Sequence, residues 1–185
     1  MKMIDESILV TNQKELKAYS VSNNERLSSV IGYDLEDYIR NQAIEDEKAV
    51  KQKNIIIKSA VDNCIMGFYS LKFNPDLYFP TSAFENVKAF ELLNFSKNAN
   101  NSTLLLADKT NFSEYAFGQL IMPKLIFAAK ISSAKLVYVN TPIICPLVQV
   151  FLDLGFEIPD DDEIRKRIMY ENHFNPNTAF MYKIL

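Results

Sequence analysis

The residues of this chain that could do chemistry have no partner residues at the spacing of a catalytic motif. Tyr138 lies in the apolar run 136–139, and Cys145 follows it closely. Hydroxyl and thiol groups can act as acids when a site positions them. Alternatively, Tyr138 is a packed strand residue and Cys145 is a small buried hydrophobe. His173, the only histidine, has no Asp or Cys at motif spacing, so a nucleophilic triad is not expected.

The cysteine pattern and the amino-terminal sequence indicate a cytoplasmic protein. Cys64 and Cys145 are far apart, and neither belongs to a Cys-x-x-Cys pair. We therefore expect no disulfide framework and no metal site. The amino terminus lacks the apolar core of a signal peptide, and no run reaches the roughly 18 apolar residues of a membrane span. Contact with a membrane is not expected.

Composition predicts one globular domain over residues 1–185. Apolar residues make up 48% of the chain and charged residues 23%, which is ordinary globular usage. The net charge of −3 and the pI near 5.3 make nucleic acid an unfavoured partner, since its binding depends on Lys and Arg that neutralise phosphates. Four nearby lysines (Lys48, Lys51, Lys53 and Lys58) could form a local basic patch. A solvated helix face with its exit loop is the alternative.

The positioning elements follow from hydrophobic periodicity and turn residues. A short strand is predicted at Ile8–Val10, and a helix at 35–50 with Asp34 as its N-cap. Helices are also predicted at 117–131, with Pro123 near the first turns, at 147–154 with Gly155 as its stop, and at 160–167. The remaining strands are predicted at 54–59, 65–73, 87–95, 102–108, 136–139 and 179–184, the first two as a hairpin. The order of elements indicates an α/β or α+β domain.

Three segments in order resemble the GNAT acyltransferases, and within them the branch that includes the acetyltransferase toxins of toxin–antitoxin modules. Residues 33–41, YDLEDYIRN, resemble that branch's helix with a Leu-x-x-Phe/Tyr-Ile/Leu repeat. Residues 67–71, GFYSL, resemble its Gly-Tyr-Tyr-Ser-Leu strand. Residues 150–156, VFLDLGF, resemble the family's Phe-Tyr-x-x-x-Gly-Phe helix end. The resemblance implies a single-domain GNAT-like fold, with a mixed, mostly antiparallel sheet flanked by helices.

The same resemblance implies an acetyl-CoA site. Leu106 and Ala107 correspond to the strand whose exposed backbone pairs with the pantetheine arm. The loop that holds the pyrophosphate on backbone N–H groups at a helix start corresponds to Ser113, Glu114, Tyr115, Ala116, Phe117 and Gly118. Ala116 and Gly118 match its small residues, whereas Ser113 and Glu114 depart from the pattern. A Ser113 that only caps a core helix is the alternative.

The family's tyrosine acid corresponds to Phe151, which has no hydroxyl. Tyr138 and Cys145 are the nearest candidates to replace it, and activity can survive without an acid because positioning supplies much of the rate. The resemblance thus implies an acetyl-CoA-dependent N-acyltransferase that acts on an amine. A catalytically degenerate GNAT-fold binding or regulatory protein is the alternative, and a homodimer or protein partner is compatible with both. Acetylation of charged tRNA, raised by the branch, is disfavoured by the acidic pI.

Overall fold

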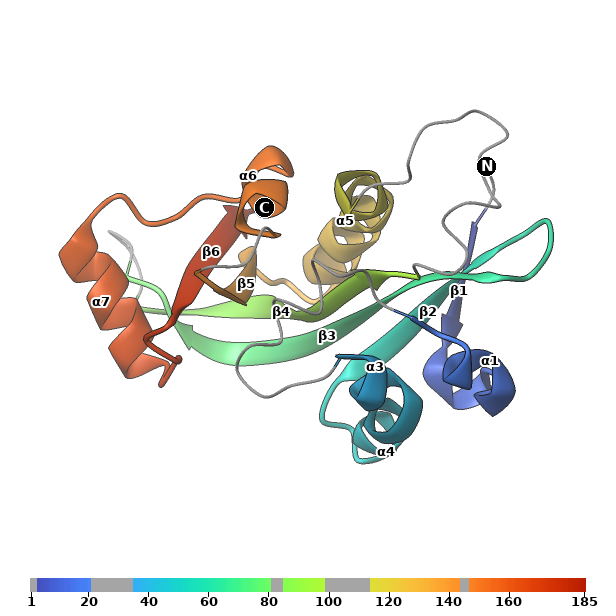
Figure 1. Cartoon of the computed structure of the whole chain (residues 1–185). Helices are drawn as coiled ribbons and strands as arrows, with labels where there is room; N and C mark the ends of the chain where they lie inside the picture. The colour runs from blue at the N-terminus through green and yellow to red at the C-terminus, as the bar shows by residue number, and fades with distance from the viewer. Residues whose placement is uncertain (1–2, 21–34, 81–84, 99–113, 144–146) are drawn as a thin grey trace. The chain divides into compact units, whose positions relative to one another are not determined.

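The computed structural model describes residues 3–20, 35–80, 85–98, 114–143 and 147–185 (Figure 1). Its six strands follow one another in a sheet of order β1-β2-β3-β4-β5-β6, which is mostly antiparallel and flanked by helices. This confirms the predicted fold class. The chain separates into two compact units, Met1–Leu71 with Asn94–Phe117, and Lys72–Leu93 with Gly118–Leu185. Strands β3 (Ile65–Tyr78) and β4 (Asn86–Lys97) contribute residues to both units.

The first unit begins with β1 (Met3–Ser7), which runs antiparallel to β2 (Lys53–Ser59). The predicted strand at Ile8–Val10 is wrong, because these residues form a 3-10 turn, η1. Ser7 caps this turn by accepting a hydrogen bond from the N–H of Leu9 at 3.3 Å. A helix that the sequence did not predict, α1 (Gln13–Lys17), follows with Asn12 as its N-cap. Local capping thus outweighs strand propensity here.

The helix predicted at 35–50 is confirmed as far as Lys48, in three consecutive segments. These are α3 (Leu35–Asp37), a π-helical segment η2 (Tyr38–Gln42) and α4 (Ala43–Lys48). Val50 takes a positive φ of 56°, so the helix cannot continue through it. The predicted N-cap, Asp34, lies outside the described residues. Figure 1 shows α1, α3 and α4 gathered beside β1 and β2.

The predicted hairpin is confirmed, since β2 pairs with β3 in antiparallel register. Its helix-facing side packs into a core of side chains from η1, the α1 segment, the three helical segments from α3 to α4, and both strands. The members are Ile8, Leu16, Tyr19, Leu35, Tyr38, Ile39, Ala43, Ile56, Ile65 and Phe68. The hairpin turn at Asn63 has a φ of 59°, a left-handed conformation that Asn tolerates better than most residues.

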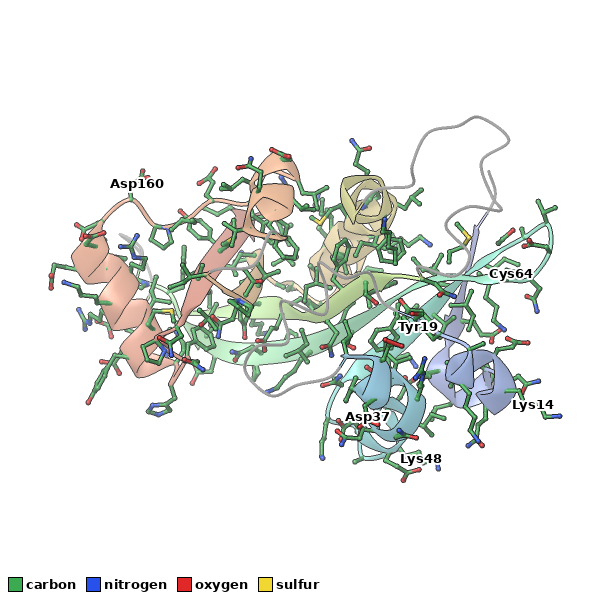
Figure 2. All side chains as sticks on the ribbon, in the orientation of Figure 1. Lys14, Tyr19, Asp37, Lys48, Cys64 and Asp160 are labelled. Carbon is green, nitrogen blue, oxygen red and sulfur yellow. The ribbon has the colours of Figure 1, made fainter. Side chains whose placement is uncertain are left out.

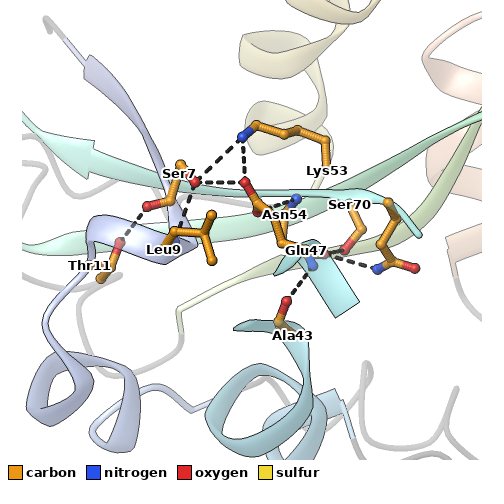
Figure 3. Close-up of polar contacts among 9 residues, drawn as sticks. Ser7, Leu9, Thr11, Ala43, Glu47, Lys53, Asn54 and Ser70 are labelled. Atoms are coloured by element: carbon orange, nitrogen blue, oxygen red, sulfur yellow. Dashed lines mark hydrogen bonds and ion pairs between the residues drawn. The ribbon is translucent and has the colours of Figure 1, made fainter. Parts of the chain in front are cut away.

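A buried polar network ties this core together (Figure 3). Asn54 is fully buried, donates to the Ala43 carbonyl at 2.7 Å and accepts from the Ser70 hydroxyl at 2.7 Å. Its backbone N–H donates to Glu47 Oε2 at 2.9 Å. Glu47 also accepts from Ser7 at 2.7 Å and pairs with Lys53. Side chains from four separate segments are thereby held in one arrangement.

The four lysines considered as a basic patch are each paired with a carboxylate. Lys48 pairs with Glu45 at 2.8 Å and Lys51 with Asp46 at 2.9 Å, and Lys48 lies on the outer side of α4 (Figure 2). Lys53 pairs with Glu47, and the buried Lys58 pairs with both Glu6 and Glu15. These pairings cancel the charge locally. Lys48 and Lys51 fit the alternative of a solvated helix face with its exit loop, whereas Lys58 is a buried residue of β2.

The second unit is built on β5 (Leu136–Pro142) and β6 (Thr178–Ile184), which pair antiparallel over seven residues. Its core combines three aromatic side chains with five aliphatic ones, and the members are Leu77, Phe79, Val87, Ala89, Leu136, Tyr138, Ile168 and Phe180. Helix α7 (Asp162–Glu171) contributes Ile168 and is capped by the Asp161 carboxylate, which accepts from two backbone N–H groups. The helix predicted at 160–167 and the strand predicted at 179–184 are both confirmed.

Helix α5 (Glu114–Ile131) begins earlier than predicted, so Pro123 lies in its interior and not near its first turns. A proline there removes one donor from the helical hydrogen-bond ladder. Helix α6 (Leu147–Asp153) ends as predicted at Gly155, whose φ of 80° suits glycine. The strand predicted at 102–108 lies outside the described residues.

Candidate active site

The centre of the second unit holds the one parallel strand pair that the described residues contain. Strands β4 and β5 pair over three positions, Ala89 with Leu136, Phe90 with Val137, and Glu91 with Tyr138. Both strands then continue, β4 to Lys97 and β5 to Pro142. The last pair in register, Glu91 and Tyr138, is therefore the point at which the pairing ends.

Three polar side chains meet at this point. The Tyr138 hydroxyl donates to Glu91 Oε2 at 3.1 Å, and Asn74 Nδ2 donates to the Tyr138 hydroxyl at 3.2 Å. Asn74 comes from β3, so three neighbouring strands each provide one member. Tyr138 is 1% exposed and packs against the rings of Phe174 and Phe180, at 5.8 Å and 5.6 Å between centroids. We name Asn74, Glu91 and Tyr138 the β4–β5 cluster.

Burial shifts the titration of both ionisable members. It raises the pKa of Glu91 above the usual value, an effect that the Tyr138 hydrogen bond and the charge of Lys72 partly offset. Burial also raises the pKa of Tyr138, and the neighbouring Glu91 carboxylate raises it further. Tyr138 therefore stays protonated at neutral pH and donates to the carboxylate. A carboxylate with a raised pKa is a stronger base than an exposed one.

Asn140 adds an unused acceptor near this cluster. It lies two residues beyond Tyr138 on β5, so it projects from the same face of the strand. Its buried Oδ1 has no hydrogen-bond partner among the described residues. A buried acceptor without a partner costs free energy unless a ligand or water supplies a donor. Glu91 and Asn140 together suit a ligand that donates hydrogen bonds, as an amine does.

The sequence pointed to Tyr138 but missed Glu91 and Asn74. Glu91 is the only carboxylate in the predicted strand 87–95. A single carboxylate among apolar residues is a signal that could have marked it as a candidate site residue. What could not be read was the register, because a long connection separates β4 from β5. The pairing of Glu91 with Tyr138 depends on how that connection places the second strand.

Two residues of the expected phosphate loop make close packing contacts. Phe117 is fully buried in the first unit, and its ring lies 5.1 Å from that of Phe95. A Cβ built on Gly118, in the second unit, would meet Leu154 Cδ1 at 2.4 Å. Gly118 therefore leaves space for a side chain of the α6 segment. The preceding residues Glu114, Tyr115 and Ala116 form the first turn of α5.

The remaining predicted site residues divide into core and undescribed positions. Phe151 is 3% exposed, with its ring 5.4 Å from that of Phe156, so it belongs to the core. Leu106, Ala107, Ser113 and Cys145 lie outside the described residues. Cys64, in the turn between β2 and β3 (Figure 2), has its pKa raised by burial and by Asp62, which disfavours a reactive thiolate.

Comparison with known proteins identifies the fold. No family model matches the chain, and no curated protein matches it. Among solved structures, a Tyr-to-Phe mutant of KacT is 12% identical, with a TM-score of 0.62 over 100% of this chain and 95% of that one. A Tyr-to-Phe mutant of the toxin AtaT, bound to the C-terminus of the antitoxin AtaR and acetyl-CoA, is 11% identical, with a TM-score of 0.62 over 100% and 94%.

AtaT complexed with acetyl-methionyl-tRNAfMet is also similar, at 11% identity and a TM-score of 0.60 over 97% of this chain and 94% of that one. Nearly the whole length of both chains is covered in each case. The chain therefore has the fold of the KacT and AtaT structures, which is GNAT-like. At sequence identities this low, structural similarity establishes the fold alone, and the activity has to be inferred from the site.

Two searches of the described residues bear on the kind of site. No group of three or more His, Cys, Asp or Glu side chains there could hold a metal ion. Among the same residues, no helix is long and apolar enough to cross a membrane.

Proposed function

We propose that the chain is an acetyl-CoA-dependent N-acyltransferase that acts on an amine, with residues 1–185 forming one acyltransferase domain. The observation that carries this proposal is the β4–β5 cluster, where a half-buried carboxylate of raised pKa lies at the end of a short parallel register. The GNAT-like fold supports acetyl-CoA as the cosubstrate. Backbone groups of β5 beyond its register with β4, which lie within the second unit, would hold it.

In this function Glu91 serves as the general base. An amine attacks the thioester carbonyl, the new C–N bond forms, and the C–S bond breaks. Glu91 takes the proton that the amine loses and returns it through water to the departing thiolate, which restores the carboxylate. Tyr138 holds the Glu91 carboxylate in place and Asn74 orients the Tyr138 hydroxyl, while Asn140 Oδ1 accepts a second N–H of the amine. Tyr138 positions the base in this scheme and is not the acid.

The test is acetyl transfer to a panel of amines, with product followed by mass spectrometry. Glu91→Gln keeps the shape and the hydrogen bond from Tyr138 but cannot accept a proton. We expect it to lower turnover by about 10²–10⁴-fold. Glu85→Gln, at an exposed position in the same unit, is the matched control and should leave turnover unchanged. Equal turnover of the two variants would remove Glu91 from the chemistry.

A second candidate is a catalytically degenerate GNAT-fold binding or regulatory protein. Phe151 favours it, because the residue at the position of the family's tyrosine lacks a hydroxyl and is packed in the core. The departures at Ser113 and Glu114 point the same way. Under this alternative, acetyl-CoA produces neither binding heat nor acetylated product, and the chain acts through a protein partner. Solved structures that bind an antitoxin make such a partner a reasonable proposal.

Nucleic-acid binding and a cytoplasmic location have less support than the acyltransferase function. Similar structures include an AtaT–tRNA complex and a KacTA–DNA complex. The net charge of −3 and the paired lysines of the first unit weigh against a phosphate-binding face on this chain. A cytoplasmic location stays a prediction from the cysteine usage.

A further inference from the structure

A cavity of about 700 Å³ opens beside α7 and the start of β6, within the second unit. Its lining combines apolar and aromatic side chains with two cations, and no carboxylate lines it among the described residues. The lining residues are Ile143, Ile158, Arg165, Lys166, Met169, Tyr170, Phe174, Pro176, Thr178 and Ala179. A volume of this size is typical of pockets for small organic ligands. The site described above does not use it.

The two cations are free to change partners. Arg165 Nη2 lies 2.6 Å from Asp162 Oδ1, and Lys166 Nζ lies 3.0 Å from Glu163 Oε1, one turn earlier on α7. All four side chains are well exposed, and exposed pairs of this kind contribute little stability. Either cation can therefore turn to a ligand anion at little cost. The carboxylates of both pairs stand outside the cavity lining.

Tyr170 and Phe174 show which parts of the wall face solvent and which face the core. Tyr170 is 77% exposed and stands at the rim. Phe174 is a wall of the cavity and also stacks on Phe180 with an interplanar angle of 18°. The cavity thus offers an apolar floor fixed by the core and a cationic, exposed edge. An apolar body with one negative end matches both.

We propose that this cavity binds a small carboxylate with an apolar body, with the body against Met169 and Phe174 and the carboxylate at Arg165 and Lys166. The proposal is independent of the acyltransferase function. Octanoate is a suitable probe. For a ligand of about ten non-hydrogen atoms, ordinary ligand efficiency gives a dissociation constant in the millimolar range.

The chain contains no tryptophan, so a single introduced one reports without background. Tyr170→Trp places it at the rim of the cavity. Phe127→Trp, at a 66% exposed position on α5 that does not line the cavity, is the matched control. Octanoate should change the emission of Tyr170→Trp saturably and leave that of Phe127→Trp unchanged. Acetate, 1-octanol and octylamine test the apolar body, the charge and its sign in turn.

In the Tyr170→Trp background, Arg165→Gln with Lys166→Gln should weaken octanoate binding by about fivefold and leave 1-octanol unaffected. An unchanged melting temperature establishes that the helix is intact. The proposal is overturned if octanoate up to about 20 mM, well above a millimolar constant, leaves the emission unchanged. It is also overturned if octylamine binds as well as octanoate. Emission that follows protein concentration alone would instead identify a second copy of the chain as the occupant.

Discussion

Asn54 offers the sharpest test of the packing in the first unit. The residue is fully buried, and its amide group makes hydrogen bonds to several partners (Figure 3). Nδ2 donates to the Ala43 carbonyl, and Oδ1 accepts from the Ser70 hydroxyl and from Gln52 Nε2, the latter at 2.9 Å. Asn54→Leu keeps a similar volume but removes every one of these bonds. The Ser70 hydroxyl and the Ala43 carbonyl are then buried with fewer partners.

The expected cost follows from these two groups. Leaving a buried polar group without its partner costs about 1–3 kcal/mol, so the two together give about 2–6 kcal/mol. That is a large share of the roughly 5–15 kcal/mol that stabilises a typical domain. Urea denaturation followed by circular dichroism measures the difference from the midpoint and slope. Asn86→Leu, at an exposed position, is the matched control and should change stability by less than about 0.5 kcal/mol.

A loss below about 1 kcal/mol for Asn54→Leu would refute the reasoning. It would mean that water or a shifted side chain satisfies Ser70 and Ala43, so that the network does not hold the strands and helix together. A loss with an unchanged denaturant slope would locate the effect in the native state.

Three further substitutions test other parts of the structure. Gly67→Ala should lower the melting temperature markedly, because its Cβ would lie 2.8 Å from the Ser96 carbonyl oxygen, which belongs to the backbone and cannot turn away; an unchanged temperature contradicts this. Glu91→Gln should raise the melting temperature at pH 7, since a carboxyl whose pKa is raised by folding loses stability as pH rises from 4.5 through the raised pKa. The gain should vanish below pH 4.5. Phe151→Tyr should cost about 1–3 kcal/mol in urea denaturation by burying a hydroxyl, and no cost would mean that the hydroxyl finds a partner.

Local sequence signals predicted most elements of the fold. The hairpin of β2 and β3, the stop of α6 at Gly155 and the aromatic strand β6 depend on neighbouring residues, so periodicity and turn residues sufficed. Ile8–Val10 was predicted as a strand because its composition is apolar, whereas the Ser7 cap makes it a 3-10 turn. The early start of α5 was missed because Glu114 and Tyr115 follow a polar run and resemble its continuation.

The candidate site was less predictable, because it depends on long-range register. Tyr138 could be selected from its residue type, but its partners Glu91 and Asn74 come from strands far away in sequence. The resemblance placed Phe117 and Gly118 in a phosphate loop, and it could not show that both are in close packing contact. Backbone recognition of a cosubstrate leaves little trace in side chains.

Calorimetric titration of acetyl-CoA into the protein is the most direct test of the central claim. An acyltransferase should bind acetyl-CoA saturably with one site per chain. Acetyl-CoA at about 100 times its dissociation constant should also stabilise the fold by roughly 2.7 kcal/mol. Glu91→Gln should bind equally well, since Glu91 is assigned to the chemistry and not to the cosubstrate. The absence of both binding heat and thermal stabilisation would contradict an acyltransferase function and leave the GNAT-like fold as a binding or regulatory module.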